Sequence, residues 1–300
     1  MKQEPIYHNF LSVLEEKLSI LPDKSEETAE NTLRALWLTA SGRCVSPIAA
    51  EKMELPVLTE AQITQLEEFI QHRIKGVPLA HITERQNFMN MDLILSSVNY
   101  IPRKDTELLA KAAIETIMEE FQHEQKVIVI DLCTGIGTVA LAIAQNSKNA
   151  HVYGSDIHPP AIESANINAR YFSLTERTTF FNADMFQPFE ALALKEKTDI
   201  IVSAPPYIST ERVKNMAPEI ALHEPKEAFD AGPLGLSIFN SLINTAPEYL
   251  NTNGYLIFEC GQGQGEFLAS RIENSGHFGK VIRINDEKGN VRVLKAKKVS

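Results

Sequence analysis

The chain has 300 residues, 44% hydrophobic and 23% charged, a composition typical of globular proteins that excludes a disordered or fibrous one. Since a domain usually holds ~100 to 200 residues, we expect two hydrophobic cores, one in a large domain and one in a small domain. The formal net charge of −10 argues against a nucleic-acid partner, because phosphates are bound by clusters of Lys and Arg.

The first part of the chain carries apolar residues at helical spacing. They fall in three groups: Phe10, Val13, Leu14 and Leu18, then Leu33, Leu36, Trp37 and Leu38, then Ile63, Leu66, Ile70 and Ile74. Helix starts are predicted at Ser25-Glu-Glu-Thr28 and Thr59-Glu-Ala-Gln62, where a hydroxyl residue precedes acidic or amide residues. We therefore predict a small helical domain over residues 1–80, with Trp37 in its core.

A short β-hairpin is predicted in the linker over residues 81–105. Its strands would be Met91-Asp-Leu-Ile-Leu95 and Ser97-Val-Asn-Tyr-Ile101, and Pro102 ends the second one. Thr106-Glu-Leu-Leu-Ala-Lys-Ala-Ala-Ile114 then begins a helix and opens a third region, residues 106–300.

Strand patterns alternate with helical patterns after residue 126, which predicts an α/β fold with a mostly parallel sheet covered on both faces. The predicted strands lie at residues 127–132, 151–155, 179–183, 199–203 and 254–260, and the first two are followed by helices near 138–144 and 160–170. At the end, Val281-Ile-Arg-Ile284 and Val291-Arg-Val-Leu294 flank a turn and predict an antiparallel hairpin at the sheet edge.

The segment Val127-Ile-Val-Ile-Asp-Leu-Cys-Thr-Gly-Ile-Gly-Thr138 is predicted as a buried strand that runs into a glycine turn and a helix. Gly135 and Gly137 let the backbone approach a ligand, and the free amides at the helix N-terminus offer hydrogen bonds to a polar group. Ordinary strand-to-helix connections also contain glycines, so this segment alone leaves both interpretations open.

Asp156 ends the next predicted strand, 21 residues beyond Gly135. An acid at this distance lies at the tip of the second strand, where its carboxylate accepts the ribose hydroxyls of a nucleoside. The alternative is that Asp156 caps the helix near Pro159-Pro160. The sequence lacks the third glycine of a dinucleotide site, so the two features together favour a different nucleoside-containing ligand.

Asn182-Ala-Asp-Met-Phe186 ends the third predicted strand and supplies an acid and apolar side chains that could enclose an adenine ring. Taken alone, this segment is better explained as a capped turn with core aromatics. Glu259 ends the fifth predicted strand, where we expect a hydrogen-bonded polar group in the wall of a site rather than a general base.

The segment Asp199-Ile-Ile-Val-Ser-Ala-Pro-Pro-Tyr207 is predicted as a buried strand ending in a rigid turn at the carboxyl edge of the sheet. Prolines fix φ and donate no hydrogen bond, which frees nearby carbonyls to point into a site. Tyr207 can stack on a flat substrate group or receive a methyl cation at its face. A strand simply terminated by two prolines is the alternative.

The sequence indicates neither a metal site nor a membrane segment. The three cysteines, Cys44, Cys133 and Cys260, are widely separated and form no CxxC pair. Four scattered histidines are expected at the surface or at helix ends: His81, His151, His158 and His223. No run approaches the ~18 apolar residues that span a bilayer and the start shows no signal segment, so we expect a cytoplasmic protein.

These motifs resemble those of the class I methyltransferases, and specifically the release-factor glutamine N5-methyltransferases of the HemK/PrmC family. The resemblance extends over nearly the whole chain. It rests on Gly76-Val-Pro-Leu-Ala-His-Ile-Thr83, Phe88, Ile101-Pro-Arg-Lys-Asp-Thr-Glu107, Asp131-Leu-Cys-Thr-Gly-Ile-Gly137, Ala204-Pro-Pro-Tyr207, His223-Glu-Pro225, Gly232-Pro-Leu-Gly-Leu236 and Glu259-Cys-Gly261.

The resemblance implies a Rossmann-like domain with a seven-stranded, mostly parallel sheet and an antiparallel C-terminal hairpin, which binds S-adenosylmethionine and releases S-adenosylhomocysteine. It implies that the helical domain recognises a protein substrate, a peptide chain release factor. Within the site, Cys133 to Gly137 would wrap the methionine part, Asp156 would hold the ribose and Met185 would pack on adenine. Arg103 and Thr106 would close the cofactor side from the linker.

The site residues implied by the resemblance form two sets. The cofactor-binding set is Asp131, Cys133, Thr134, Gly135, Ile136, Gly137, Asp156, Ile157, Asp184, Met185, Ala204, Arg103 and Thr106. The catalytic set is Ala204, Pro205, Pro206 and Tyr207.

The chain departs from the family pattern at Ala204, where relatives resembling it carry Asn-Pro-Pro-Tyr. In that pattern the Asn side chain and the first Pro carbonyl grip the target amide. Here the grip is reduced to the Pro205 carbonyl, and a lost partner for a buried polar group costs ~1 to 3 kcal/mol. Cys133 and Ile136 also stand where Gly and Ser are usual, which changes shape and polarity without removing a required charge.

The substrate therefore stays open between three interpretations. A glutamine side chain in a release factor is the first choice. A small metabolite methylated on N, O or C is the second, because Ala204 opens volume and removes polarity. A relative that binds the cofactor without catalysis is the third. Adenine methylation in nucleic acid is disfavoured by the acidic charge and the missing polar first residue.

Overall fold

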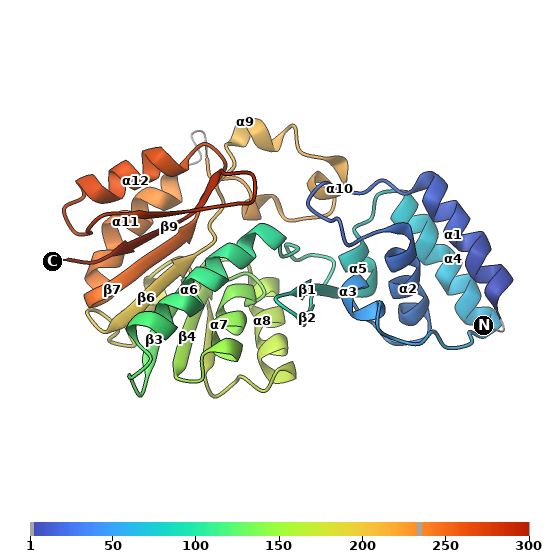
Figure 1. The fold of residues 1–300 in the computed structure, drawn as a ribbon, viewed down its shortest axis with the longest axis horizontal. Helices are drawn as coiled ribbons and strands as arrows, with labels where there is room; N and C mark the ends of the chain where they lie inside the picture. Colours follow the sequence, from blue (N-terminus) through green and yellow to red (C-terminus); the bar gives the residue numbers. More distant parts are fainter. Residues whose placement is uncertain (1–2, 233–235, 300) are drawn as a thin grey trace. The chain divides into compact units, whose positions relative to one another are not determined.

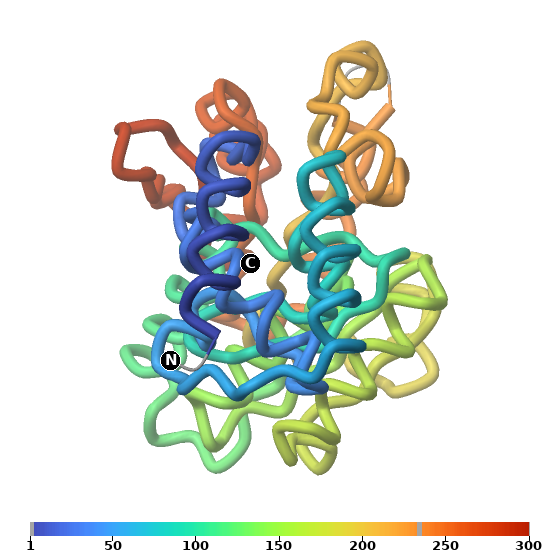
Figure 2. The backbone as a smooth tube through the Cα atoms, turned by 90° about the vertical axis from the view of Figure 1, so that its right-hand side faces the viewer, coloured from blue at the N-terminus to red at the C-terminus, as the bar shows by residue number. Residues whose placement is uncertain are grey.

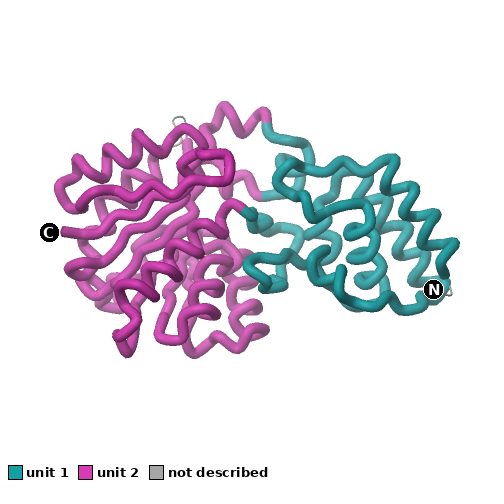
Figure 3. Tube along the Cα trace, viewed as in Figure 1, with its two compact units in different colours: residues 1–104, 216–224 teal, residues 105–215, 225–300 magenta. Residues whose placement is uncertain are grey.

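The computed structural model describes residues 3–232 and 236–299. The chain divides into two compact units, each with its own core (Figure 3). Unit 1 contains Met1–Lys104 and Met216–Glu224, and unit 2 contains Asp105–Asn215 and Pro225–Ser300. Residues 81–104 of the predicted linker lie in unit 1. Segment 216–224, predicted inside the third region, belongs to unit 1 as well.

Unit 1 is built mainly from helices that pack against one another (Figure 2). Their bounds are α1 (Glu4–Lys17), α2 (Ala29–Ala40), α3 (Pro47–Ala50), α4 (Glu60–Ile74), α5 (Leu79–Thr83) and α10 (Pro218–Ala221). The core gathers Leu14, Leu33, Leu36 and Leu66 around Trp37, whose indole N–H donates to the Pro56 carbonyl at 2.8 Å. Trp37 therefore lies in the core of unit 1.

One of the two predicted helix starts is shifted in the structure. At Thr59 the hydroxyl accepts from the Gln62 amide and the Gln62 side chain accepts from the Thr59 amide, a complete capping box. In the other segment the capping residue of α2 is Thr28, which accepts from the Asn31 amide at 3.1 Å. Ser25 lies before the helix. The chain between Ser25 and Thr28 places the Glu27 side chain in the interior, where Glu27 is 2% exposed.

The linker hairpin pairs different strands from those predicted. It joins β1 (Arg85–Phe88) to β2 (Met91–Ile94) in antiparallel register. Met89 and Asn90 both have positive φ, 48° and 64°, as a two-residue hairpin turn requires. The predicted second strand, residues 97–101, is a turn, because the Asn99 side chain accepts from the Ser96 amide at 2.8 Å and bends the chain.

Unit 2 contains a seven-stranded sheet of order β5-β4-β3-β6-β7-β9-β8 (Figure 1). The strands are β3 (Val127–Leu132), β4 (Ala150–Asp156), β5 (Thr178–Asn182), β6 (Thr198–Ser203), β7 (Leu250–Glu259), β8 (Ile282–Asn285) and β9 (Val291–Lys297). Strands β3 to β7 are parallel, and β9 pairs antiparallel with β7 and β8. This is the order of a class I methyltransferase fold, so the predicted fold class is confirmed.

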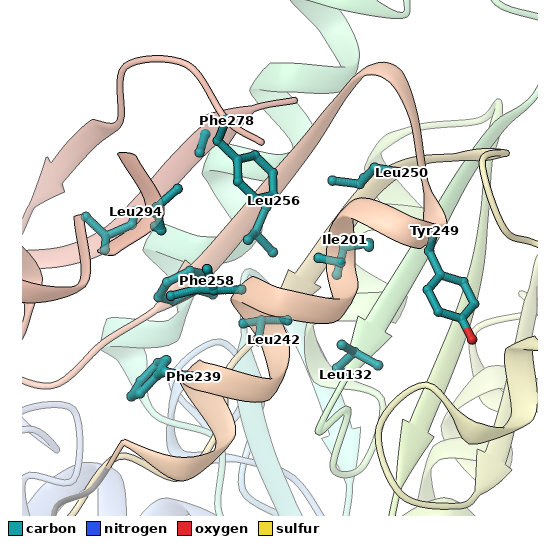
Figure 4. Close-up of a cluster of buried hydrophobic side chains, with 14 of the residues drawn as sticks. Leu132, Ile201, Phe239, Leu242, Tyr249, Leu250, Leu256, Phe258, Phe278 and Leu294 are labelled. Atoms are coloured by element: carbon teal, nitrogen blue, oxygen red, sulfur yellow. The ribbon is translucent and has the colours of Figure 1, made fainter. Parts of the chain in front are cut away.

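Helices cover both faces of this sheet, and every residue of β6 is buried as a result. They are α6 (Glu107–Glu120), α7 (Thr138–Asn146), α8 (Pro159–Tyr171), α11 (Ser237–Tyr249) and α12 (Gly265–Asn274). A short helix, α9 (Thr210–Val213), follows the Pro-Pro-Tyr segment, and short 3-10 turns lie at Lys104–Thr106, Gln187–Phe189 and Lys226–Ala228. Aromatic and aliphatic side chains of α11 interlock with those of β6 and β7 (Figure 4). No helix in the described ranges is long and apolar enough to span a bilayer.

The parallel strands all end at the same edge of the sheet, which gathers the loops that follow them. Strand order reverses between β3 and β6, since β4 lies on one side of β3 and β6 on the other. Ligands of open α/β sheets bind in the crevice at such a reversal. The glycine turn after β3 and the Pro-Pro-Tyr turn after β6 are therefore neighbours at this edge.

Candidate active site

The glycine turn connects β3 to α7 through three residues in the left-handed region. Cys133, Gly135 and Gly137 have φ of 58°, 57° and 82°. No heavy atom lies within 4 Å of the position that a Cβ on Gly135 would take, whereas a Cβ on Gly137 would meet Leu141 and Phe180 at 3.0 Å. Gly135 thus borders open space, and Gly137 permits close packing of helix on sheet.

Asp131, near the end of β3, forms hydrogen bonds that hold the glycine turn in place. Its buried carboxylate accepts from the Thr134 hydroxyl at 2.6 Å and from the Ala140 amide at 3.1 Å, and it is 1% exposed. Burial raises the pKa of this carboxyl to about 7, although the two hydrogen bonds oppose the shift. Asp131 therefore ties both ends of the turn together, and its oxygens face the protein interior.

Asp156 ends β4 and lies beside the turn. One carboxylate oxygen accepts from the Gly135 amide at 2.9 Å and the other from the His158 amide at 2.9 Å. The residue that caps α8 is His158, without a side-chain cap, so the interpretation of Asp156 as helix cap is wrong. A carboxylate offers about four acceptor positions, so Asp156 keeps acceptor capacity beside these bonds. Ile157, which follows, is 60% exposed.

The segment after β5 faces the glycine turn through sulfur atoms. The Met185 Sδ lies 4.0 Å from the Cys133 Sγ, and the Ser155 hydroxyl donates to the Met185 carbonyl at 2.7 Å. Phe186 is a core residue stacked on Tyr249, with ring centroids 4.7 Å apart. Asp184 is exposed. Burial raises the pKa of the Cys133 thiol, which keeps it protonated and unsuited to act as a nucleophile.

The Pro-Pro-Tyr turn begins where β6 ends. Ser203 pairs with Leu132 of β3, and its hydroxyl donates to the Leu132 carbonyl at 2.9 Å. Ala204 and Tyr207 are partly exposed, and Pro205 is buried. The four residues follow a strand adjacent to β3, so the turn lies next to the glycine turn.

Tyr207 is held by residues of β9 and of the loop between β7 and α12. Arg292 of β9 donates to its hydroxyl at 3.2 Å, with the guanidinium 5.8 Å from the ring centroid, and Gln264 donates to its carbonyl at 3.1 Å. Arg292 also contacts Glu259, whose other oxygen accepts from the Thr106 hydroxyl at 2.7 Å. Glu259 is 2% exposed, and burial raises its pKa.

Two of these residues were missed by sequence reasoning. Arg292 lies in the predicted terminal strand, and a long cation on a half-buried strand was the available signal. Gln264 carried no signal, because glutamine is common in loops and helix ends. Glu259 was expected as a hydrogen-bonded polar group, and it has the partners that such a group needs.

Arg103 and Thr106, predicted together, belong to different units. In unit 1, Arg103 forms an ion pair with the buried Glu224, and its guanidinium lies 5.3 Å from the Tyr100 ring centroid. Thr106, in unit 2, donates to Glu259. A role of Arg103 at the cofactor stays a prediction.

The described residues contain no group of three or more His, Cys, Asp or Glu that could hold a metal ion. His81 was expected at the surface or at a helix end, and it is neither exposed nor the capping residue of α5. This ring is 8% exposed and its Nε2 lies 3.1 Å from the Asn99 carbonyl, because α5 packs into the core of unit 1. Of the motif at residues 232–236, residues 233–235 lie outside the described part of the chain.

The amino-acid sequence is similar to those of several known proteins. The family model "Methyltransferase small domain" matches residues 111–233. A release factor glutamine methyltransferase of Bacillus anthracis is 32% identical over 79% of this chain and 82% of that protein. Those of Bradyrhizobium diazoefficiens and Geobacter sulfurreducens are 34% and 29% identical, covering 82% and 98% of this chain and 80% and 98% of theirs.

Among solved structures, the ribosomal protein L11 methylase of Lactobacillus delbrueckii subsp. bulgaricus aligns with a TM-score of 0.47 and 16% identity. The alignment covers 72% of this chain and 90% of that one.

Proposed function

Because this chain belongs to the family of release factor glutamine methyltransferases, we propose that it transfers the methyl group of S-adenosylmethionine to a glutamine side-chain amide of a peptide chain release factor. The observation that carries the proposal is the juxtaposition of two turns on adjacent strands. The open glycine turn after β3 lies beside the Pro-Pro-Tyr turn after β6. The proposed location is the cytoplasm, with no nucleic acid or membrane as partner.

The residues of unit 2 fit this cofactor. Open space above Gly135 admits the methionine part against backbone. Asp156 keeps acceptor capacity for the ribose hydroxyls, and the exposed Ile157 and the Met185 thioether are apolar surfaces for an adenine ring. Thr134 and Ile136 shape the turn, while Asp131 holds it from within.

Methyl transfer from a sulfonium needs an in-line approach, exclusion of water and a free lone pair on the acceptor. When bound, S-adenosylmethionine would supply the electrophilic methyl group and leave as S-adenosylhomocysteine, while the methylated amide nitrogen would lose one proton to solvent. The Pro205 carbonyl accepts a hydrogen bond from the acceptor amide, and the Tyr207 ring packs beside it. Pro206 keeps the turn rigid, since its ring fixes φ. Positioning by these residues supplies most of the acceleration.

Ala204 is the residue that tests the substrate. It offers no side-chain partner to a glutamine amide, so Ala204→Asn is expected to raise methylation of the release factor about tenfold or more, in line with ~1 to 3 kcal/mol per buried hydrogen-bond partner. The assay measures labelled methyl groups transferred from S-adenosylmethionine to the purified factor. Ala191→Asn, at an exposed alanine, is the matched control.

Three outcomes separate the candidates. Stoichiometric methylation by the native protein supports the proposed substrate. Activity that arises only in Ala204→Asn favours a small, less polar acceptor for the native site, which is the second candidate and rests on the volume and polarity removed at Ala204. Calorimetry that detects no binding at millimolar S-adenosylmethionine would contradict the proposal as a whole.

A further inference from the structure

Four segments of unit 2 that are far apart in sequence meet around Tyr207. They are the residues before α6, the Pro-Pro-Tyr turn, the end of β7 with the following loop, and strand β9. The antiparallel pairing of β9 with β7, in which Glu259 faces Val293, brings Arg292 to the carboxyl end of β7. We call Thr106, Glu259, Gln264 and Arg292 the tyrosine clamp.

The clamp constrains every part of Tyr207. Its hydroxyl accepts from Arg292 at 3.2 Å, and its carbonyl accepts from Gln264 at 3.1 Å. The guanidinium of Arg292 lies 5.8 Å from the ring centroid, within range of a cation–π attraction. On another side a Cβ on Gly261 would come within 2.9 Å of the ring Cδ2, so only glycine leaves the ring in this place.

The charges of the clamp are arranged around one guanidinium. One nitrogen of Arg292 contacts Glu259 at 3.3 Å, and another contacts Asp105 at 3.1 Å. The Glu259 side chain is 3% exposed and that of Arg292 is 12% exposed. A planar guanidinium can satisfy two carboxylates and a phenol at once, whereas the ammonium of a lysine is a single point charge.

Such a pair is costly to bury, and apolar residues of similar size would often give equal or greater stability. The position of this ion pair beside the Pro-Pro-Tyr turn is therefore not explained by stability alone. That reason is geometric: the pair fixes a ring on which the acceptor rests. Orientation by the ring matters more in this chain, since Ala204 contributes no side-chain hydrogen bond.

We infer that Arg292 and Glu259 are positioning residues for the methyl acceptor, which act by holding the Tyr207 ring in place. The inference rests on the proposed function in that Tyr207 is taken to pack beside the acceptor. Neither residue touches the cofactor in this assignment. Loss of the clamp therefore lowers the rate of transfer and leaves cofactor affinity unchanged.

The kinetic test uses Arg292→Lys and Glu259→Gln in the full chain with S-adenosylmethionine and release factor. We expect kcat to fall about 10- to 100-fold, the range in which small misplacements of reacting groups act. In Arg292→Lys the Kd of S-adenosylmethionine should stay within about twofold, because the residues of the glycine turn keep their contacts and Thr106 keeps its hydrogen bond to Glu259. Unchanged kcat, or equal losses in kcat and cofactor affinity, would overturn the inference.

The matched controls are Arg283→Lys and Glu266→Gln. These residues form the same kind of ion pair, at 3.0 Å, between β8 and α12, but Glu266 is 71% exposed and neither residue contacts the site. Both controls should keep native kcat. If they lose as much activity as the clamp variants, a general effect on the sheet edge explains the loss and the inference is wrong.

A second readout needs no activity. The protein is labelled with 3-fluorotyrosine, and the ¹⁹F resonance of Tyr207 is assigned by its loss in Tyr207→Phe. In Arg292→Lys this resonance should shift or broaden, whereas in Arg283→Lys it should not. A resonance unmoved in both Arg292→Lys and Glu259→Gln would overturn the inference. If it moves as expected while no release factor is methylated, the clamp is real and the proposed substrate is the part that fails.

Discussion

Gly154, in the middle of β4, lies directly beneath the glycine turn. A Cβ at this position would stand 2.6 Å from Phe180 Cδ1 and 2.9 Å from the Thr134 hydroxyl oxygen. The Gly154→Ala variant should lose about 1 to 3 kcal/mol of unfolding free energy, because overpacked cores must shift their neighbours. It should also bind S-adenosylmethionine more weakly, since Thr134 belongs to the turn. Urea unfolding and calorimetry measure the two effects.

Gly279→Ala is the control for this change. The atom nearest to its added Cβ belongs to the side chain of Val299 and is 3.3 Å away, and Val299 is exposed, so it can move aside. It should alter unfolding and cofactor binding little. Native cofactor affinity in Gly154→Ala would show that Thr134 does not set the shape of the turn.

His81 makes the stability of unit 1 depend on pH. Burial, with the charges of Lys24 and Arg103 nearby, lowers its pKa from 6.5 to about 4, although the Asn99 carbonyl opposes the shift. The contribution of the neutral ring to stability is therefore present above pH 6.5 and is lost as the pH falls through about 4. The unfolding free energy of the native protein relative to His81→Gln should decrease over this window, by at most about 1.4 kcal/mol per pH unit.

Urea unfolding at several pH values, followed by the fluorescence of Trp37, measures this decrease. His72→Gln, at an exposed histidine of α4, is the control for replacing a histidine in unit 1. A constant difference between native protein and His81→Gln from pH 7 to pH 4 would mean that the ring titrates normally.

At the scale of elements, segment 216–224 is fastened to the helices of unit 1 by buried charges. Glu219, which is 9% exposed, accepts from Lys24 at 3.2 Å and from Arg73 at 3.1 Å, and Glu27 contacts the same two cations. Two carboxylates and two cations thus balance inside the core. Glu219→Gln leaves an uncompensated buried cation and should cost about 3 to 5 kcal/mol.

Trp37 lies in the same unit, so its fluorescence during urea unfolding reports this loss. Glu67→Gln removes an exposed carboxylate of α4 and should change stability by less than about 0.5 kcal/mol. If Glu219→Gln and Glu67→Gln had the same unfolding free energy, the buried ion pairs of Glu219 would make no net contribution to stability.

For the whole molecule, the two separate cores predict that the cofactor changes the unfolding transitions of the two units by different amounts. S-adenosylmethionine is assigned to unit 2, and Trp37, the one tryptophan in the sequence, lies in unit 1. At 100 times its Kd the cofactor should stabilise unit 2 by about 2.7 kcal/mol. The calorimetric transition of unit 2 should move upward, while the Trp37 fluorescence transition moves less. Identical shifts of both signals would show that the chain unfolds as one cooperative unit.

Much of this fold could be predicted because hydrophobic periodicity and glycine φ preferences depend on residues close together in sequence. The strand over residues 127–132 matches β3, and the left-handed φ of Gly135 and Gly137 is what a glycine turn implies. The linker hairpin failed for the opposite reason. Residues 97–101 have the composition of a strand, but the Ser96 amide donates a hydrogen bond to the Asn99 side chain and the chain turns there. Strand β2 pairs instead with β1, which precedes it.

The alternation of strands and helices, the glycine turn with its acid on the next strand, and the Pro-Pro-Tyr turn could be predicted from the sequence, because periodicity, φ preferences and spacing act over a few residues. The three-dimensional fold was needed to show that segment 216–224 joins the helices and that Arg292 contacts Tyr207, 85 residues away in the chain. Strand order and the burial of paired charges bring such residues together, and neither is written in a local pattern.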